Sequence, residues 1–449
     1  MNSSLMDSTQ VIGWMGAIAP TQFVIVPPNE ADNFDTPLPS LTGRYGVGTQ
    51  FFDFVDPTRP TIFTPHPTDY RALTVQIWYP SLPLSQGRPT SYLSEATAQA
   101  YGHQLELPAD VIQDVVEEAT SIFTHAYLDA PLAATDQPYP VIFFSPGLGV
   151  MREFYTSHAE QLASHGYVVV SLSHPYNAPV TEFADGRIVR QRWDAQATDQ
   201  NFLEQDALTN YLQLRSTDAQ FILDQLTQWS QQNPTVNPFV GSLDLAHVGM
   251  FGHNLGGATT AEVMRVDPRF KAGINVNGSL LSEGADQGLD RPFMTISAGL
   301  CDHLPSDGPG LSPDRPMDTL RGRAQRRCFD PLKGDGYCLT VVGARHNDFF
   351  DLPLLELEPG GGFGTLPLGR ATEITQAYTL AFFDRYLKHQ PQSLLTGPSR
   401  AFPEVEMLIR ADQTQSIQTQ SVPKPHVFIR MLTLIGTFLN RRGAFYRLR

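Results

Sequence analysis

The fold is decided by one stretch of the chain, His247-Val248-Gly249-Met250-Phe251-Gly252-His253-Asn254-Leu255-Gly256-Gly257-Ala258. Its first half is apolar and predicts a buried strand, and its second half is typical of the start of a helix. Gly252 and Gly256 predict a sharp turn between the two, because a β-carbon would clash there. A strand, a tight G-x-S-x-G turn and a helix together form a nucleophile elbow. In this chain the central position, where the motif has serine, is Asn254.

Short, continuous apolar runs on both sides of this stretch predict more buried strands. We expect strands at 140–144, 167–172, 246–251, 272–276, 292–297 and 338–342, and alternating strands earlier, at 50–55 and 73–79. Helical patterns separate them, at 204–230 and 373–388. In the first helix Leu208, Leu212, Ala219, Ile222, Leu226 and Trp229 share one face. Buried strands that alternate with helices predict a mostly parallel sheet covered on both faces.

The domain organisation follows from changes in composition along the chain. Residues 1–42 form an irregular N-terminal lead-in, and residues 43–395 form the main domain. A helical insertion is expected at 92–130, where a lid over a site would lie, with Val111, Val115, Ala119 and Ile122 at apolar spacing. Residues 302–337 are polar and rich in Gly and Pro, which predicts a long excursion. Residues 396–449 are expected to form a linker and a basic amphipathic tail.

The composition limits the classes of function. The chain has 449 residues with 41% hydrophobic residues, so it is long enough for a large α/β domain. Its net charge of −15 argues against a nucleic acid as partner. Its three cysteines are few and odd in number, which favours a reducing compartment. Apolar runs fall short of the ~18 residues of a membrane span, and the N-terminus is a poor signal peptide, so we expect a cytoplasmic protein.

The C-terminal segment differs from the body in charge. No acidic residue follows Asp412, whereas the segment contains the largely apolar run 427–439 among the basic residues Lys424, Arg430, Arg441, Arg442, Arg447 and Arg449. A basic amphipathic segment can lie on an anionic membrane surface. The same spacing also suits a helix that docks on the body or on a partner protein. We therefore expect a membrane-surface or protein contact through 424–449, or packing against the body.

Two further stretches have the order that acyl-transfer chemistry needs. Phe143-Phe144-Ser145-Pro146-Gly147-Leu148-Gly149 follows a predicted strand, and its glycines allow the Leu148 N–H to face a carbonyl oxygen. The Leu255 N–H, just after the elbow, would be the second oxyanion donor. His346, in Gly343-Ala344-Arg345-His346-Asn347-Asp348-Phe349, lies on the loop after the last strand, in the position of a general base.

These motifs resemble the platelet-activating factor acetylhydrolase family, of the plasma and type II intracellular kind with its bacterial relatives, within the α/β hydrolases. The resemblance covers roughly residues 43–390 and includes 143–149, 252–260, 267–275, 343–349 and the turn His174-Pro175-Tyr176-Asn177. It implies an α/β hydrolase domain that cleaves carboxylic or phospholipid esters without metal or organic cofactor. It also implies that Asn254 matches the serine nucleophile, Asn277 the aspartate and His346 the histidine, with Leu148 and Leu255 as oxyanion donors.

Two of these three catalytic positions hold amides. A carboxamide nitrogen is a poor nucleophile because its lone pair is delocalised, and Asn277 cannot carry the charge that stabilises an imidazolium. Loss of the aspartate charge alone costs ~10⁴ in rate and loss of the nucleophile ~10⁶. Asp302 is an alternative partner for His346, and Ser279 an alternative hydroxyl. Thr259 and Thr260 should lie inside the helix and point away from the elbow.

Two main hypotheses follow, beside a third in which the protein has a purely structural role mediated by the basic tail. In the first, the chain is a catalytically impaired or inactive family member, a pseudoenzyme that binds a small ester or phospholipid or regulates an active relative. In the second, it is a lipid or carboxyl esterase with residual or rerouted catalysis through His346, by way of Ser279 or a water oriented by Asn254.

Overall fold

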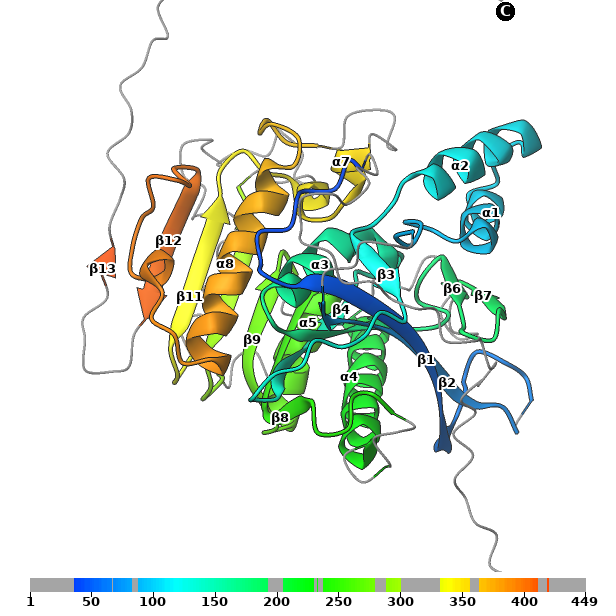
Figure 1. The fold of residues 1–449 in the computed structure, drawn as a ribbon, viewed down its shortest axis with the longest axis horizontal. Coiled ribbons are helices and arrows are strands. Elements are labelled where there is room, and N and C mark those ends of the chain that lie inside the picture. The colour runs from blue at the N-terminus through cyan, green and yellow to red at the C-terminus, as the bar shows by residue number, and fades with distance from the viewer. Residues whose placement is uncertain are drawn as a thin grey trace, which may run out of the picture.

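The computed structural model describes residues 36–66, 68–82, 88–192, 205–229, 232, 237–278, 288–299, 332–355, 363–410 and 418–419. Its centre is an 11-stranded sheet, in the order β13-β12-β11-β10-β9-β8-β4-β5-β2-β1-β3 (Figure 1). The strands of this sheet are β1 Gly46–Pro60, β2 Tyr70–Ser81, β3 Ala126–Leu128, β4 Tyr139–Ser145, β5 Val168–Ser173, β8 Leu243–His253, β9 Phe270–Val276, β10 Phe293–Ala298, β11 Gly336–Val341, β12 Val405–Arg410 and β13 Gln418–Thr419.

The middle of the sheet is parallel, as the apolar runs predicted. Strands β5, β4, β8, β9, β10 and β11 pair in parallel in that spatial order. The pairs β1–β2, β2–β5 and β11–β12 at the two flanks are antiparallel. Each of the six central strands overlaps a segment expected from the sequence, and most of their residues are buried, which explains the continuous apolar runs.

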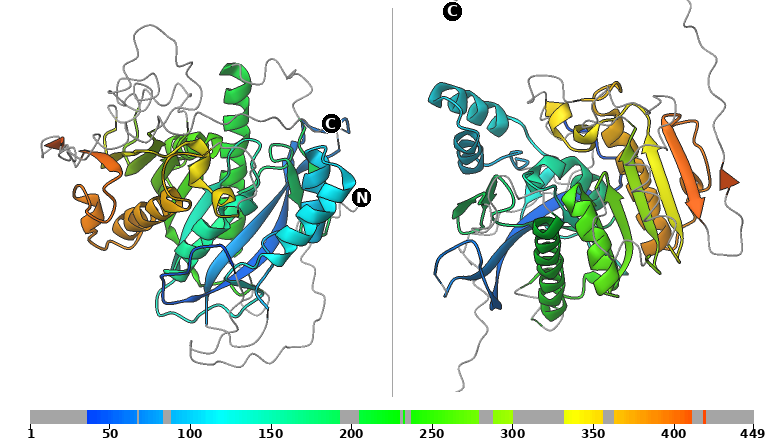
Figure 2. Two further views of the ribbon diagram at one scale, coloured as in Figure 1. Left: turned by 90° about the horizontal axis from the view of Figure 1, so that it is seen from above. Right: turned by 180° about the vertical axis from the view of Figure 1, so that it is seen from behind.

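Helices cover both faces of this sheet (Figure 2). The helices of the structure are α1 Glu95–Gln104, α2 Ala109–Ser121, α3 Thr156–Ser164, α4 Gln205–Trp229, α5 Leu255–Val266, α7 Leu352–Leu355 and α8 Arg370–Leu387. Side chains alternate along β4, so that Ile142 and Phe144 pack with α3 and α8. Val141 and Phe143 pack with α4 and α5 on the other face.

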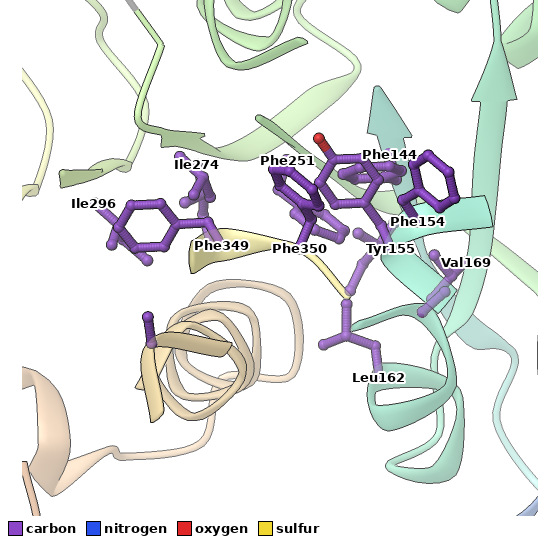
Figure 3. Close-up of a cluster of buried hydrophobic side chains, with 14 of the residues drawn as sticks. Phe144, Phe154, Tyr155, Leu162, Val169, Phe251, Ile274, Ile296, Phe349 and Phe350 are labelled. Atoms are coloured by element: carbon purple, nitrogen blue, oxygen red, sulfur yellow. The ribbon is translucent and has the colours of Figure 1, made fainter. Parts of the chain in front are cut away.

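The core on the α3 and α8 face is rich in aromatic rings. Figure 3 shows Phe144, Phe251, Tyr155 and Phe350 gathered beside the carboxyl ends of the central strands. The rings of Phe144 and Tyr155 lie 4.6 Å apart, and those of Phe144 and Phe251 also 4.6 Å apart. Such contacts hold the ends of β4 and β8 rigidly, and the candidate site lies on those ends.

The insertion forms two helices that project from the body beside the two-stranded sheet of β6 Val180–Glu182 and β7 Ile188–Arg190 (Figure 1). The predicted apolar face of α2 is wrong by one residue. Ile112, Val116 and Ala119 are buried, whereas Val111 is 38% exposed. The segment returns through β3, which pairs in parallel with β1, so the end of the insertion is part of the main sheet.

The sheet extends past residue 395, where we expected the main domain to end. Strand β12 pairs antiparallel with β11, and β13 pairs with β12. The start of the predicted linker therefore supplies an edge of the sheet. The lead-in before residue 36, the excursion at 302–331 and the tail at 424–449 lie outside the described residues. The described helices include none that is long and apolar enough to cross a membrane.

Candidate active site

The elbow has the backbone geometry that its glycines predict. Asn254 follows β8 and precedes α5 with φ 55° and ψ −123°, a conformation rare for residues other than glycine. A β-carbon on Gly256 would lie 1.9 Å from the Ser145 carbonyl oxygen, and one on Gly252 would lie 2.3 Å from the Gly256 carbonyl. Strained backbone of this kind costs ~1–3 kcal/mol and gathers at functional sites. The tight turn presents the side chain of residue 254 at the end of the sheet.

His346 lies on an anchored turn after β11. The Asp348 carboxylate accepts the Arg345 N–H at 2.9 Å and the Gly364 N–H at 2.9 Å. Phe349 and Phe350, which follow, are buried in the aromatic core (Figure 3). The turn is therefore fixed on both sides of the imidazole.

The Asn254 carboxamide contacts both an expected oxyanion donor and the expected base. Its Oδ1 accepts the Leu255 N–H at 2.7 Å, and its Nδ2 lies 2.9 Å from His346 Nε2. The orientation of the amide follows from the first contact, because only the oxygen can accept from a backbone N–H. The same side chain thus binds the Leu255 N–H, which an oxyanion would use, and contacts His346 Nε2, which would take a proton from a nucleophile.

Asn277 faces the other nitrogen of the imidazole. It follows β9 at φ 51°, it is 2% exposed, and its Oδ1 accepts the Ala298 N–H at 3.1 Å. Its Nδ2 therefore lies toward His346 Nδ1, at 2.6 Å. The structure thus brings Asn254, His346 and Asn277 together in the order of a Ser-His-Asp triad.

The two amides present N–H groups to both ring nitrogens of His346. A neutral imidazole has one nitrogen that accepts and one that donates, and an imidazolium has two that donate. Because both ring nitrogens of an imidazolium donate, neither could accept from an amide N–H, so these contacts disfavour the imidazolium form of His346. A triad needs the opposite arrangement, in which a carboxylate accepts from Nδ1 and stabilises the imidazolium.

A hydrogen-bonded chain joins the 146–149 loop to the His346 turn. His253 Nε2 donates to the His346 carbonyl at 3.2 Å, so His253 Nδ1 accepts, and the Tyr155 hydroxyl donates to it at 2.7 Å. Burial raises the pKa of Tyr155 well above its usual range, which keeps the hydroxyl protonated. The Gly147 backbone N–H is near the same hydroxyl and acts to lower its pKa. The sequence placed His253 inside the motif but gave no sign of this role.

Behind the loop lies a cluster of buried charges that we did not predict. Asp218 on α4 accepts from Arg71 at 2.6 Å and from His174 Nδ1 at 2.9 Å, and His174 Nε2 lies 2.9 Å from the Ser145 hydroxyl. Burial acts to raise the pKa of Asp218, but the Arg71 charge and these hydrogen bonds outweigh it and hold that pKa well below its usual range. Burial lowers the pKa of His174 to about 4, so this ring is neutral at pH 7.

Ser145, His174 and Asp218 have the connectivity of a catalytic triad, but their environment excludes that role. Their exposed fractions are 0%, 1% and 0%. A serine nucleophile must reach the carbonyl carbon of its substrate, and the Ser145 hydroxyl is enclosed between β4, the 174–177 turn and α4. One sequence signal could have revealed the cluster. Arg215 and Asp218 are opposite charges spaced three residues apart on the apolar face of the 204–230 helix.

The alternative groups are placed only in part. Asp302 and Ser279 lie outside the described residues. Thr259 and Thr260 lie within α5, as expected, and their hydroxyls donate to the Leu255 carbonyl at 2.8 Å and the Gly256 carbonyl at 3.0 Å. Over the part of the chain that the structure describes, His, Cys, Asp and Glu side chains form no group of three or more suited to a metal.

The parallel sheet, the elbow after β8 and the histidine after β11 define an α/β hydrolase. The model of the family described as "Platelet-activating factor acetylhydrolase, isoform II" matches residues 32–296, and the chain belongs to this family of esterases.

Individual relatives agree with the family. A probable 1-alkyl-2-acetylglycerophosphocholine esterase of Arthroderma benhamiae is 26% identical over 402 residues, 83% of this chain and 93% of that protein. A platelet-activating factor acetylhydrolase of Cavia porcellus is 24% identical over 68% of each chain. A solved structure of a ferulic acid esterase from Streptomyces cinnamoneus is 31% identical, with a TM-score of 0.65, over 82% of this chain and 98% of that one.

Proposed function

We propose that this chain is a catalytically silenced member of its esterase family, which binds a small ester or phospholipid without turning it over. The observation that carries the proposal is the pair of contacts made by the Asn254 carboxamide. Its oxygen takes the Leu255 N–H at 2.7 Å and its nitrogen faces His346 at 2.9 Å. An amide nitrogen does not replace an alkoxide as nucleophile.

The setting of Asn277 supports the same proposal. The relatives carry the names of acetylhydrolases and esterases, so an ester of a lipid is the ligand class that we propose for this chain. Catalysis of such a cleavage requires that His346 become an imidazolium. At 2.6 Å from Nδ1 the Asn277 amide offers an N–H where a carboxylate would offer negative charge. Binding does not need this charge, whereas turnover does.

The test is to restore both groups. In Asn254→Ser/Asn277→Asp we expect hydrolysis of a chromogenic acetate ester to rise at least ~10³-fold over the unaltered chain, because the nucleophile and the acid each carry several orders of magnitude. The double variant should also be labelled by a fluorophosphonate, and His346→Ala in that background should abolish both signals. Asn254→Ala/Asn277→Asp, which lacks a hydroxyl, is the matched control and should stay inert.

Two results would contradict the proposal. One is labelling of the unaltered chain by the fluorophosphonate, and the other is an esterase rate of the unaltered chain that His346→Ala removes. Either would favour the second hypothesis of residual or rerouted catalysis.

We further propose that residues 424–449 bring the protein to a membrane surface, because they combine basic and apolar residues.

A further inference from the structure

The buried guanidinium of Arg215 contacts the backbone of the 146–149 loop from behind. Its Nη1 donates to the Pro146 carbonyl at 2.8 Å, and its Nη2 donates to the Gly147 carbonyl at 3.3 Å. Its Nε donates to Asn177 Oδ1 at 3.1 Å. The side chain is 1% exposed, and each of these three acceptors is an uncharged oxygen. A buried cation is costly unless it is fully hydrogen-bonded, so these contacts fix its position.

The contacts determine which way two peptide groups point. In a trans peptide the carbonyl and the N–H point in opposite directions. The Pro146 carbonyl accepts from Arg215, so the N–H of the same peptide, that of Gly147, points to the opposite side of the loop, where Tyr155 lies. The Gly147 carbonyl also bonds Arg215, so the Leu148 N–H points away from the guanidinium, toward the side of Tyr155.

That side is the one on which the elbow lies. A β-carbon on Gly147 would lie 3.3 Å from the Asn254 β-carbon and 3.6 Å from the Tyr155 hydroxyl. The end of the loop is also fixed, because the Gly149 N–H donates to the Asn177 carbonyl at 2.9 Å. Asn177 thus holds both the loop and Arg215.

We infer that Arg215 is a positioning residue for the oxyanion site: by holding the Pro146 and Gly147 carbonyls, it turns the Leu148 N–H toward the reacting end of residue 254. This inference rests on the proposed role of Leu148 as an oxyanion donor in the restored enzyme. Asp218, three residues further along α4, binds Arg71 and His174, and His174 Nε2 lies against the Ser145 hydroxyl at the base of the same loop. The four groups form one buried scaffold behind the donor.

Arg215→Gln tests the inference in two ways. In a crystal structure of the otherwise unaltered chain, we expect the Gly147–Leu148 peptide to rotate away from the orientation described above. In the Asn254→Ser/Asn277→Asp background we expect kcat to fall ~10²–10³-fold with KM within a factor of about three, which is the effect of losing one oxyanion donor. A role in stability alone would not separate kcat from KM in this way.

Arg59→Gln is the matched control. Arg59 is an arginine that binds Asp218, at 2.9 Å, and its side chain is 20% exposed. The substitution removes a guanidinium that has no described contact with the 146–149 loop, so the peptide orientation and kcat should not change. If Arg215→Gln does not fold, Arg215→Lys takes its place, because an ammonium keeps the charge but not the fork that spans two carbonyls.

The inference is overturned if a folded Arg215 variant keeps the Gly147–Leu148 peptide in place. It is equally overturned if Arg215→Gln leaves the kcat of the Asn254→Ser/Asn277→Asp variant unchanged. The crystal structure of Arg215→Gln in the otherwise unaltered chain tests the inference even when the double variant has no activity. If the double variant is inert but Arg215→Gln rotates the peptide in the otherwise unaltered chain, the two amides alone do not account for the silencing, and the positioning by Arg215 remains supported.

Discussion

At the scale of single residues, the carboxamide of Asn254 occupies the hydrogen-bonding groups that surround the elbow. The elbow, the Leu255 N–H and His346 are all present around it, and the amide satisfies both neighbours with one side chain. Asn also tolerates the positive φ of 55° better than most residues do. Asn254 therefore fits the local structure of the elbow without offering a nucleophilic oxygen.

Gly256 allows a prediction about stability at this scale. In Gly256→Ala the new β-carbon would lie 1.9 Å from the Ser145 carbonyl oxygen and 2.6 Å from that of Pro146. Both are backbone atoms at the end of a central strand, which cannot move aside cheaply. We expect the free energy of unfolding to fall by about 3 kcal/mol or more, measured by urea unfolding.

Gly186→Ala is the control for the Gly256 substitution. Gly186 also has a positive φ, of 81°, in the turn between β6 and β7, but a β-carbon there would meet no atom within 4 Å. Its cost should be limited to backbone strain, about 1 kcal/mol. Equal losses for the two variants would show that crowding at the elbow is not what requires Gly256.

At the scale of elements, a buried carboxyl joins the insertion to the helices of the body. Asp351, just before α7, receives the Ser157 N–H from α3 at 3.0 Å and the Tyr92 hydroxyl at 3.2 Å. Gln376 of α8 donates to the Ser157 hydroxyl at 3.1 Å. Burial raises the pKa of Asp351 to about 7, and the nearby Glu160 adds to the rise.

The raised pKa predicts how stability depends on pH. The unfolded chain releases the Asp351 proton near its ordinary pKa of 3.8, whereas the folded chain keeps it up to about 7. Stability is therefore lost as pH rises from about 4 to about 7, and the loss is complete above that range, on the order of a few kcal/mol. In Asp351→Asn, which is neutral throughout, this part of the pH dependence should disappear.

Urea unfolding at several pH values measures the difference between Asp351→Asn and the unaltered chain. The difference should shift in favour of the variant between pH 4 and pH 7 and stay constant above pH 8. Asp185→Asn serves as control, because the Asp185 side chain is 55% exposed, and its difference from the unaltered chain should not vary in this way. A constant difference for Asp351→Asn would show that this carboxyl ionises normally in the fold.

Elements were predictable where the pattern was local. Continuous apolar runs gave the six central strands, and the glycines of 252–257 gave the elbow, because burial on both faces and tight turns leave direct traces in the sequence. The face of α2 could not be predicted, because Val111 and Ile112 are equally apolar and only the tertiary contacts choose between them. Strand β12 was missed because it is only partly buried, its continuous apolar run covers only 407–409, and its partner β11 is distant in the sequence.

At the scale of the whole molecule, the functional geometry depends on contacts between segments far apart in the chain. The order of the elbow and His346 along the sequence, together with the family resemblance that singled out Asn277, predicted that the three meet, since the carboxyl ends of parallel strands lie at one edge of the sheet. The scaffold behind the loop was not predictable in the same way. Arg71, His174 and Arg215 come from β2, the turn after β5 and α4, and no motif links them.

The charge distribution over the whole chain leads to a last prediction, on membrane binding. Removing the six basic residues of 413–449 from a net charge of −15 leaves −21 for residues 1–412. A body of that charge is repelled by an anionic bilayer, so any attraction must come from the basic and apolar residues of 424–449. In co-sedimentation with vesicles that contain phosphatidylserine, we expect the full chain to bind at low salt and to dissociate as salt is raised.

A chain that ends at residue 423 keeps β12 and β13 and should stay in solution, as should the full chain with purely zwitterionic vesicles. Binding of the shortened chain equal to that of the full chain would assign the membrane contact to the body and refute the role of the tail.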